Sequence, residues 1–221
     1  MHIFQGLIEP NDIKQGQIGD CYFLSSIAAM AEKDSRIKSM FLTEESNEYG
    51  IYAATMFKNG IKMVVVVDDL IPCLGSSKEV AFARSNGPEL WVILLEKMWA
   101  KLHDCYDRIA GGLEYETIRD LCGAPGYFFR GIDDNTFEKI FEYDEANYMM
   151  GCSMSDTYDQ ARAEDQGIVP GHAYTLLSAA EVLDINGNCV RLVKLRNPWG
   201  SGEWNGDWSD KSPLWTEELR A

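Results

Sequence analysis

The sequence predicts an α+β protein of two lobes, with a helical N-terminal lobe over residues 1–123 and an antiparallel, β-rich C-terminal lobe over residues 124–221. Three observations lead to this prediction. Helical apolar patterns dominate the first half, strand-like runs dominate the second, and Gly123, Pro125 and Gly126 break the chain between them. A chain of 221 residues is also long for one compact core and suits two smaller ones.

The first half is expected to hold two helices and a hairpin. Residues 20–33 place apolar side chains at helical spacing behind Asp20, a residue type that often caps a helix N-terminus. Two β-rich runs, residues 51–58 and 61–67, flank an Asn-Gly pair, which is a strong hairpin signal. Residues 89–102 carry an apolar stripe that should face the core: Trp91, Leu94, Leu95, Met98, Trp99 and Leu102.

The second half is expected to be led by strands. Residues 148–154, 172–183 and 189–195 all have strand character. The last two runs flank Asn186-Gly187, which predicts a hairpin with a two-residue turn. In such a hairpin the start of the second run and the residues just beyond the third run lie at the same end.

The charge balance is strongly acidic, with 35 Asp and Glu against 20 Lys and Arg and a net charge of −15. Such a surface repels phosphate backbones and anionic membranes, so nucleic-acid binding is not expected. It suits basic partners or cations such as calcium, whose preferred ligands are oxygens. Apolar residues make up 46% of the chain, which argues against disorder and for a sizeable core.

Cysteine spacing and targeting signals bound the cellular setting. None of the six cysteines forms a C-x-x-C pair and only three histidines occur, so a structural zinc site is not expected. The sequence contains neither a signal peptide nor an apolar run near the roughly 20 residues that span a bilayer. We therefore expect a soluble, cytoplasmic protein with reduced thiols, which is compatible with a piece of a longer polypeptide.

Cys21 is the first candidate for chemistry. It stands at the N-terminus of a predicted helix, directly after a loop that contains Gly16 and Gly19. Unpaired N–H groups and the helix dipole favour a thiolate at such a place and predict a lowered pKa. The alternative is that Cys21 is simply a small buried residue.

A thiolate nucleophile needs a base, and His172 is the candidate. His2 is terminal and His103 falls at the end of a predicted helix, whereas His172 opens a predicted strand. The predicted turn places His172 opposite position 201, so Asn197 should emerge at the same end of the hairpin. An Asn carbonyl there can accept from the imidazole and fix its tautomer. On its own, Asn197 is equally compatible with a simple turn residue.

Gln15 completes the set. It precedes Cys21 by six residues, and a side-chain amide beside the Cys21 backbone N–H would stabilise the oxyanion of an acyl intermediate. Taken alone, Gln15 is only a loop glutamine. Together, the four residue types occur in the chain order Gln, Cys, His, Asn that a papain-like cysteine protease requires.

Three multi-residue motifs follow one another along the chain. They read Gln-Gly-Gln-Ile-Gly-Asp-Cys-Tyr-Phe-Leu at residues 15–24, Gly-His-Ala-Tyr at residues 171–174 and Arg-Asn-Pro-Trp-Gly at residues 196–200. In this order they resemble the calpain family of cysteine proteases. The likeness extends from about Asp12 to Asp210, which is most of the chain.

The resemblance implies a papain-like fold split into two core subdomains, with an extended peptide held in the cleft between them. It implies a catalytic triad of Cys21, His172 and Asn197, with Gln15 at the oxyanion. It also implies substrate contacts through Gly112, Gly171 and Trp199, a tryptophan that in calpains wedges between the lobes when calcium is absent. Two positions depart from the family pattern: Tyr22 replaces a Trp and Ala124 replaces a Gly.

Regulatory calcium is a further implication of the resemblance. Asp12 and Glu89 match side-chain ligands of a first Ca²⁺ site, and Glu203 and Asp210 match two ligands of a second. The chain ends before the segment that should supply the remaining ligands of the second site. We therefore expect that site to be incomplete and the β-rich lobe to be truncated. The alternative is that all four are solvated surface acids.

The leading hypothesis is a calcium-dependent intracellular cysteine endopeptidase that hydrolyses proteins through a thioester acyl-enzyme. A second hypothesis is a calpain-like, non-catalytic module that binds partners or regulates them. A third is a calpain-like peptidase that needs no calcium. Further domains outside this chain are compatible with each hypothesis.

Overall fold

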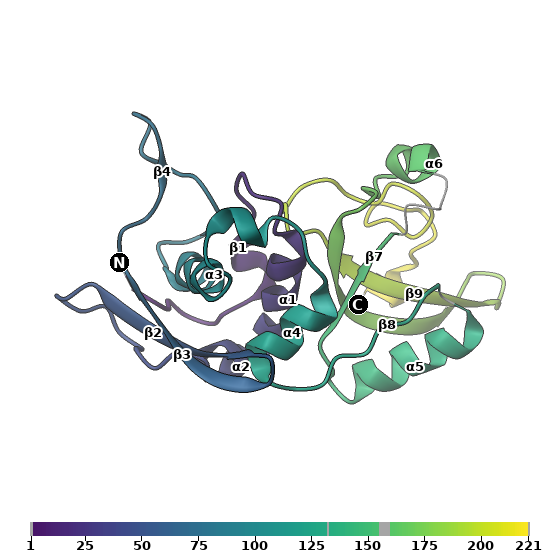
Figure 1. Cartoon of the computed structure of the whole chain (residues 1–221). Helices are drawn as coiled ribbons and strands as arrows, with labels where there is room; N and C mark the ends of the chain where they lie inside the picture. Colours follow the sequence, from purple (N-terminus) through teal and green to yellow (C-terminus); the bar gives the residue numbers. More distant parts are fainter. Residues whose placement is uncertain (1, 132, 155–159, 221) are drawn as a thin grey trace.

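The computed structural model describes residues 2–131, 133–154 and 160–220, and it shows helices and antiparallel sheets side by side (Figure 1). This confirms the α+β prediction. No helix within these ranges combines the length and apolar character needed to cross a membrane. The helices are α1 Cys21–Ala31, α2 Asp34–Lys38, α3 Trp91–Leu102, α4 Glu114–Cys122, α5 Asp134–Glu145, α6 Gln160–Asp165 and α7 Glu217–Arg220, with short 3-10 turns η1 Pro10–Asp12 and η2 Tyr106–Ile109.

The strands of the described ranges form small antiparallel sheets, ordered β1-β6, β2-β3, β4-β5 and β7-β8-β9. The three-stranded sheet belongs to the second half, as the sequence predicted. The strands are β1 Ile13–Lys14, β2 Ile51–Lys58, β3 Ile61–Asp68, β4 Cys73–Leu74, β5 Glu79–Val80, β6 Arg84–Ser85, β7 Met150–Ser153, β8 Ala173–Leu183 and β9 Cys189–Arg196.

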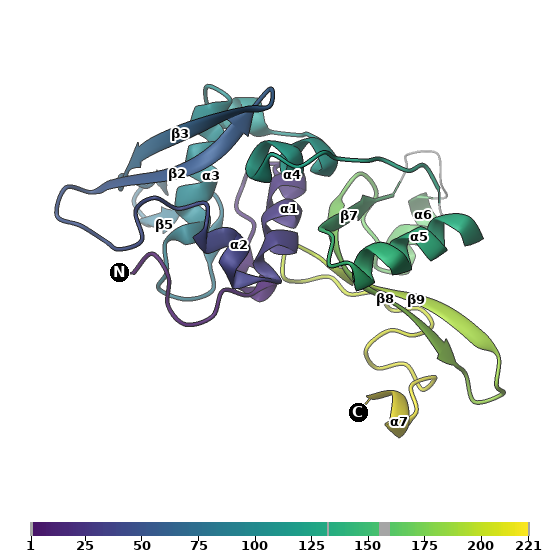
Figure 2. The same cartoon turned by 90° about the horizontal axis from the view of Figure 1, so that it is seen from below.

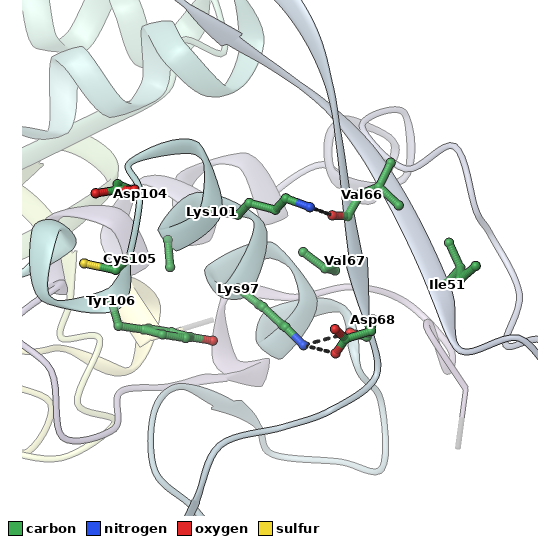
Figure 3. Close-up of a pocket in the computed structure, with 10 residues that line it drawn as sticks. Ile51, Val66, Val67, Asp68, Lys97, Lys101, Asp104, Cys105 and Tyr106 are labelled. Carbon is green, nitrogen blue, oxygen red and sulfur yellow. Dashed lines mark hydrogen bonds and ion pairs between the residues drawn. The ribbon is translucent and has the colours of Figure 1, made fainter.

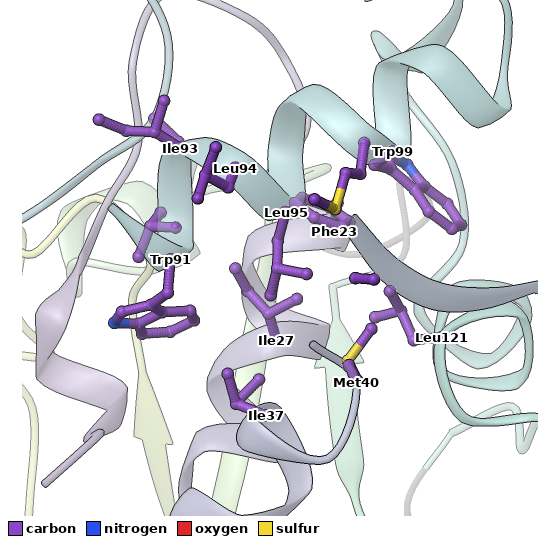
Figure 4. Packing of buried hydrophobic residues seen from close by; sticks show 14 of the residues in the cluster. Phe23, Ile27, Ile37, Met40, Trp91, Ile93, Leu94, Leu95, Trp99 and Leu121 are labelled. Carbon is purple, nitrogen blue, oxygen red and sulfur yellow. The ribbon is translucent and has the colours of Figure 1, made fainter. Parts of the chain in front are cut away.

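Helices α1 and α3 form the centre of the core (Figure 4). Every residue of α1 after Cys21 is buried, and the aromatic rings of Phe23 and Trp99 stack across the two helices at 5.3 Å. Of the six predicted stripe residues of α3, five are buried and Leu102 is partly buried. Burying each large apolar side chain contributes about 1.5–3 kcal/mol, so this cluster holds the N-terminal half together.

The β2–β3 hairpin confirms the Asn-Gly prediction. Lys58 pairs with Ile61 across a two-residue turn, in which Asn59 and Gly60 have φ values of 52° and 76°. Two successive left-handed residues define the turn type that matches the twist of the flanking strands.

The outer edge of β3 faces α3 across a pocket of about 430 Å³ (Figure 3). Lys101 donates to the carbonyl of Val66 at 2.6 Å, and Lys97 donates to the carbonyls of Asp68 and Leu70 at 3.0 and 2.6 Å. The Lys97 ammonium also pairs with the Asp68 carboxylate. These lysines therefore satisfy two carbonyls of β3 and one carbonyl just beyond its end.

The β8–β9 hairpin differs from its prediction by its turn. Leu183 pairs with Cys189, so five residues rather than two lie in the loop. The Asp184 carboxylate accepts from the N–H groups of Asn186 and Asn188 at 2.8 Å each. These two bonds stabilise a five-residue loop in place of the two-residue Asn-Gly turn that was predicted. A bulge between Leu176 and Ser178 shifts the register again.

The sheet packs against α1 and carries α5 on its other side (Figures 1 and 2). Thr175 of β8 donates its hydroxyl to the carbonyl of Ser25 in α1 at 2.9 Å, and this bond is buried. Asp144 of α5 accepts from the N–H of Ala179 at 2.9 Å. Gly123 ends α4 with a φ of 76°, and the lobe boundary expected there stays a prediction.

Candidate active site

Cys21 is the first residue of α1 and is half-buried where this helix meets β8. Its thiol lies beside the backbone N–H of Ala173. The predicted lowering of its pKa was wrong in direction. Burial raises the pKa of Cys21 above its usual value, and this outweighs the lowering by the N–H groups of Ala173 and Tyr22, while the nearby carboxyls of Asp20 and Glu114 raise it further.

His172 directly precedes β8 and is 4% exposed. Its Nε2 lies 2.8 Å from Oδ1 of Asn197, as the sequence predicted for this pair. The imidazole packs against the ring of Trp199 at 4.3 Å and against the edge of Tyr174 at 4.9 Å. The register shift explains the Trp199 contact. Thr175 pairs with Arg196, and extending this register by three residues places His172 opposite Trp199. The predicted turn would have placed position 201 opposite the histidine.

The contacts of Asn197 determine the tautomer of the imidazole. Its amide nitrogen donates to the carbonyls of Ser201 and Gly202 at 3.0 and 3.4 Å, so its oxygen must face His172. That oxygen also accepts from the N–H of Trp199 at 3.0 Å. Since an amide oxygen only accepts, Nε2 of His172 carries a proton and Nδ1 keeps its lone pair. The lone pair is what a general base requires.

The protonation equilibria of the two groups favour an uncharged pair. Burial lowers the pKa of His172, and the hydrogen bond that its ring donates to Asn197 opposes this only in part. The pKa of Cys21 is raised, as described above. Among the described residues no hydrogen bond joins Cys21 to His172. The backbone of His172 nevertheless lies near Cys21, because Ala173, whose N–H faces the thiol, follows His172 directly.

Gln15 keeps its side chain within its own loop. Its amide nitrogen donates to the carbonyl of Ile18 at 2.8 Å, which leaves one amide hydrogen for another acceptor. Its backbone N–H donates to the carbonyl of Pro198 at 3.2 Å, so the loop before the nucleophile is tied to the segment that carries Asn197. The oxyanion role of Gln15 stays a prediction.

The two candidate substrate-binding glycines have different structural reasons to be glycine. A Cβ on Gly112 would meet the ring of Tyr22 at 2.4 Å, and that ring is anchored through its hydroxyl, which donates to Ile109 and accepts from Trp99. Gly171 has a φ of 66°, in the left-handed region that favours glycine. Their role in holding a substrate backbone stays a prediction.

Asp12 and Glu89 approach each other where the N-terminal segment meets the start of α3. Glu89 is 6% exposed and its carboxylate accepts from the N–H of Gln5 at 3.1 Å, while Asp12 accepts from the N–H of Glu9 at 2.8 Å. Burial raises the pKa of Glu89, and the negative charge of Asp12 adds to the effect. A cation between the two carboxylates would relieve this repulsion.

Glu203 and Asp210 lie in the loop that follows β9. The carbonyl of Asp210 accepts from Arg220 at 3.0 Å. Within the described ranges, no group of three or more His, Cys, Asp or Glu side chains gathers at one place suited to a metal ion. Ca²⁺ takes six to eight oxygens, so either candidate site needs backbone carbonyls or water in addition to its carboxylates.

One feature next to the nucleophile was not predicted from the sequence. Asp20 was expected to cap the helix, and the Asp20 carbonyl does accept from the N–H groups of Phe23 and Leu24. The side chain of Asp20, however, makes no capping hydrogen bond and is fully buried with Glu96 of α3. The available signal was a Glu at position 96, within the apolar stripe of residues 89–102.

A cysteine at a helix N-terminus beside a hydrogen-bonded His–Asn pair on a sheet is the arrangement of a papain-like cysteine protease. A sequence profile of the calpain family of cysteine proteases matches residues 1–220, and the chain belongs to this family. The family assignment agrees with the motif resemblance.

Curated relatives from plants and mammals support the same family. The chain is 38% identical over 232 residues to calpain-type cysteine protease DEK1 of Zea mays, covering 99% of this chain and 10% of that protein. It is 35% identical over 221 residues to the calpain-2 catalytic subunit of Rattus norvegicus, covering 95% of this chain and 31% of that subunit. The chain therefore spans a third or less of the length of these relatives.

Proposed function

We propose that this chain is the catalytic core of a calcium-dependent cysteine endopeptidase that acts in the cytoplasm on protein segments in extended conformation. One observation carries the proposal: the Nε2 of His172 bonds to Asn197 while the neighbouring Ala173 N–H faces the Cys21 thiol. A base in the correct tautomer and a thiol at a helix N-terminus thus lie at one junction of the fold.

In the proposed reaction, Nδ1 of His172 takes the thiol proton and the Cys21 sulfur attacks the scissile carbonyl carbon. The tetrahedral oxyanion is stabilised by the Cys21 backbone N–H and the free amide hydrogen of Gln15. His172 then protonates the leaving amine, the C–N bond breaks and a thioester remains. Water, deprotonated by His172, attacks the thioester and releases the acid together with the thiol.

Activation requires a change at the cysteine–histidine pair. The raised pKa of Cys21 and the lowered pKa of His172 both favour the neutral pair over thiolate and imidazolium. Closer approach of the two groups would favour the ion pair, because each charge then stabilises the other. Trp199 packs on the imidazole at 4.3 Å, so movement of this ring accompanies that approach.

Calcium at Asp12 and Glu89 is the proposed regulator of the N-terminal half. Hard oxygen donors, mutual repulsion and burial of Glu89 support this choice. A divalent ion would supply positive charge between two carboxylates and tie the N-terminal segment to the start of α3. Glu203 and Asp210 are the proposed side chains of a second site.

A peptide epoxide reagent with mass mapping of the modified residue tests the proposal. We expect modification of Cys21, faster with calcium than without it. Cys21→Ala should abolish the label, whereas Cys105→Ala, which removes an exposed thiol between α3 and η2, should leave it unchanged. A label on Cys105, or none on Cys21 with calcium present, would favour the non-catalytic alternative. Equal labelling rates with and without calcium would favour a calcium-independent peptidase.

A further inference from the structure

Two carboxyl groups, those of Asp20 and Glu96, lie buried together beneath the N-terminus of α1. Asp20 is 0% exposed and Glu96 is 1% exposed. Asp20 directly precedes Cys21, and Glu96 comes from the middle of α3. The two side chains are within hydrogen-bonding contact of each other, so two acids meet where the core excludes solvent.

Within the described residues, backbone N–H groups are the donors that reach this pair, and no cationic side chain pairs with either acid. Glu96 accepts from the N–H of Ala83 at 2.9 Å. In the described part of the chain, neither carboxyl oxygen of Asp20 accepts a hydrogen bond from an N–H or hydroxyl group of another residue, and the backbone N–H of Asp20 itself is the donor near its carboxyl group. The titratable side chains that face one or both acids are Cys21, Tyr22 and Tyr106, all with raised pKa values and therefore uncharged at neutral pH.

Two ionised carboxylates at this place would both lose their hydration and would repel each other. One proton relieves both penalties, because a protonated carboxyl can donate to the carboxylate beside it. We propose that Asp20 and Glu96 hold one proton between them, and that the resulting hydrogen bond positions Cys21 by fixing the start of α1 to α3. The positioning part rests on the proposed function, whereas the shared proton does not.

The titration behaviour of both groups agrees with this geometry. Burial is the largest cause that raises the pKa of each acid. The negative charge of Asp20 raises the pKa of Glu96 further. Buried acid pairs of this kind titrate as a unit rather than as separate residues.

Glu96 lies where the segments around the nucleophile meet. Besides contacting the residue before Cys21, it holds the N–H of Ala83. The loop that leads to Cys21 packs against residues 81–83, the segment that contains Ala83. Gln17 donates to the carbonyl of Ala81 at 3.0 Å, and a Cβ on Gly16 would meet the backbone of Phe82 at 2.2 Å. Loss of the Glu96 carboxyl should therefore loosen the support of the loop as well as the start of α1.

The first test compares the thermal stability of wild type and Glu96→Gln across pH. In the folded protein the pair binds a proton that the unfolded chain releases above about pH 4, so wild-type stability should fall as pH rises toward the raised pKa values. A glutamine can donate to Asp20 and accept from Ala83 without a titrating proton. The Tm difference should grow in favour of Glu96→Gln by about 3 °C per pH unit.

Glu45→Gln, which removes an exposed carboxylate, is the matched control and should follow wild type at every pH. Infrared spectroscopy gives a direct readout of the proton. Wild type should show the C=O stretch of a buried, protonated carboxylic acid at neutral pH, and Glu96→Gln should lack it. Parallel Tm curves together with no such band in wild type would overturn the shared proton.

The second test concerns position. Glu96→Leu leaves Asp20 and the Ala83 N–H without a partner, and kcat should fall about tenfold to a hundredfold with little change in KM. Glu96→Gln keeps both contacts and should restore kcat to near the wild-type value. If Glu96→Leu does not fold, Glu96→Gln alone still decides: a tenfold loss in that variant would refute positioning by a hydrogen bond.

The two tests separate the inference from the proposed function. If Cys21 proves not to react while the infrared band and the Tm divergence are found, the proposed function fails and the shared proton stands. If Cys21 reacts but neither the band nor the divergence is found, the shared proton fails and the proposed function stands.

Discussion

The helical part of the molecule and its sheet differ in how they are held together. Every buried residue of the main core cluster precedes Gly123, except Ala173 of β8. Strand β9 has no buried residue, and β8 is buried mainly in its first half, where it meets α1. The nucleophile candidate is therefore supported by many buried residues, whereas the His–Asn pair lies on a sheet that has few.

This difference indicates where the geometry of the site is decided. Close packing around α1 limits how far Cys21 can be displaced, because protein interiors are densely packed and tolerate little movement. The position of His172 relative to Cys21 depends instead on a few contacts between the two parts. Among them are the Thr175–Ser25 hydrogen bond and the bond from the Gln15 N–H to the Pro198 carbonyl.

The largest expected effect comes from a change in the well-packed helical part, at Cys21. Cys21→Ala should abolish peptide hydrolysis, a loss of several powers of ten, because the covalent route disappears. The fold should remain, since the change removes a single half-buried sulfur. Steady-state kinetics with a fluorogenic peptide and circular dichroism measure both. Retention of a comparable kcat would show that Cys21 is not the nucleophile.

On the sheet, His172→Ala should match the Cys21 loss, because the two groups act as a unit. The double variant Cys21→Ala/His172→Ala should then be no worse than either single variant. Strictly additive losses would argue against a coupled site. Asn197→Ala should cost less, since it orients the base and does not react. Its kcat across pH is the measurement that distinguishes orientation from chemistry.

Stability should separate the two parts directly. Leu95→Ala in the core, at 0% exposure, should cost about 2–5 kcal/mol of unfolding free energy. Val193→Ala on β9, at 36% exposure, should cost less than about 1 kcal/mol. Urea unfolding followed by fluorescence measures both. Equal costs would mean that the sheet is as well packed as the helical core.

The smallest expected effect is that of calcium on the N-terminal segment. Calcium at about millimolar concentration should raise the Tm of wild type by a few degrees, because binding to the native state stabilises it. Asp12→Ala should remove most of that gain, and Glu45→Ala should not. Calorimetry decides: neither binding heat nor a Tm shift in wild type would refute the Asp12–Glu89 site.

Local patterns in the sequence predicted the elements well. The apolar stripe of α3, the Asn59-Gly60 turn and the three strands of the second half depend on neighbouring residues, and the structure contains them. The second Asn-Gly pair was misread because Asp184, two residues earlier, closes a longer loop. A short motif does not report on competition from a nearby carboxylate.

The order of the motifs along the chain was enough to predict which residues form the site. It was not enough to predict the features of the site that depend on burial in the folded protein. His172 and Asn197 meet as expected from the hairpin. The pKa of Cys21 moved the other way, because its exposure depends on how β8 covers α1, which periodicity does not report. Asp20 and Glu96 are far apart in sequence, and each alone resembles an ordinary polar residue of a helix.

The lysines at the outer edge of β3 have a consequence for how folded copies of the chain can associate. The strand contains the run Val64-Val65-Val66-Val67, and an uncovered edge of this composition is a template for pairing with another chain. Lys97 and Lys101 donate to its carbonyls at Asp68 and Val66, and the Lys97 ammonium also pairs with the Asp68 carboxylate. These carbonyls are therefore not available to a neighbouring strand that would add at this edge, which is the kind of protection that lysines near an exposed edge give.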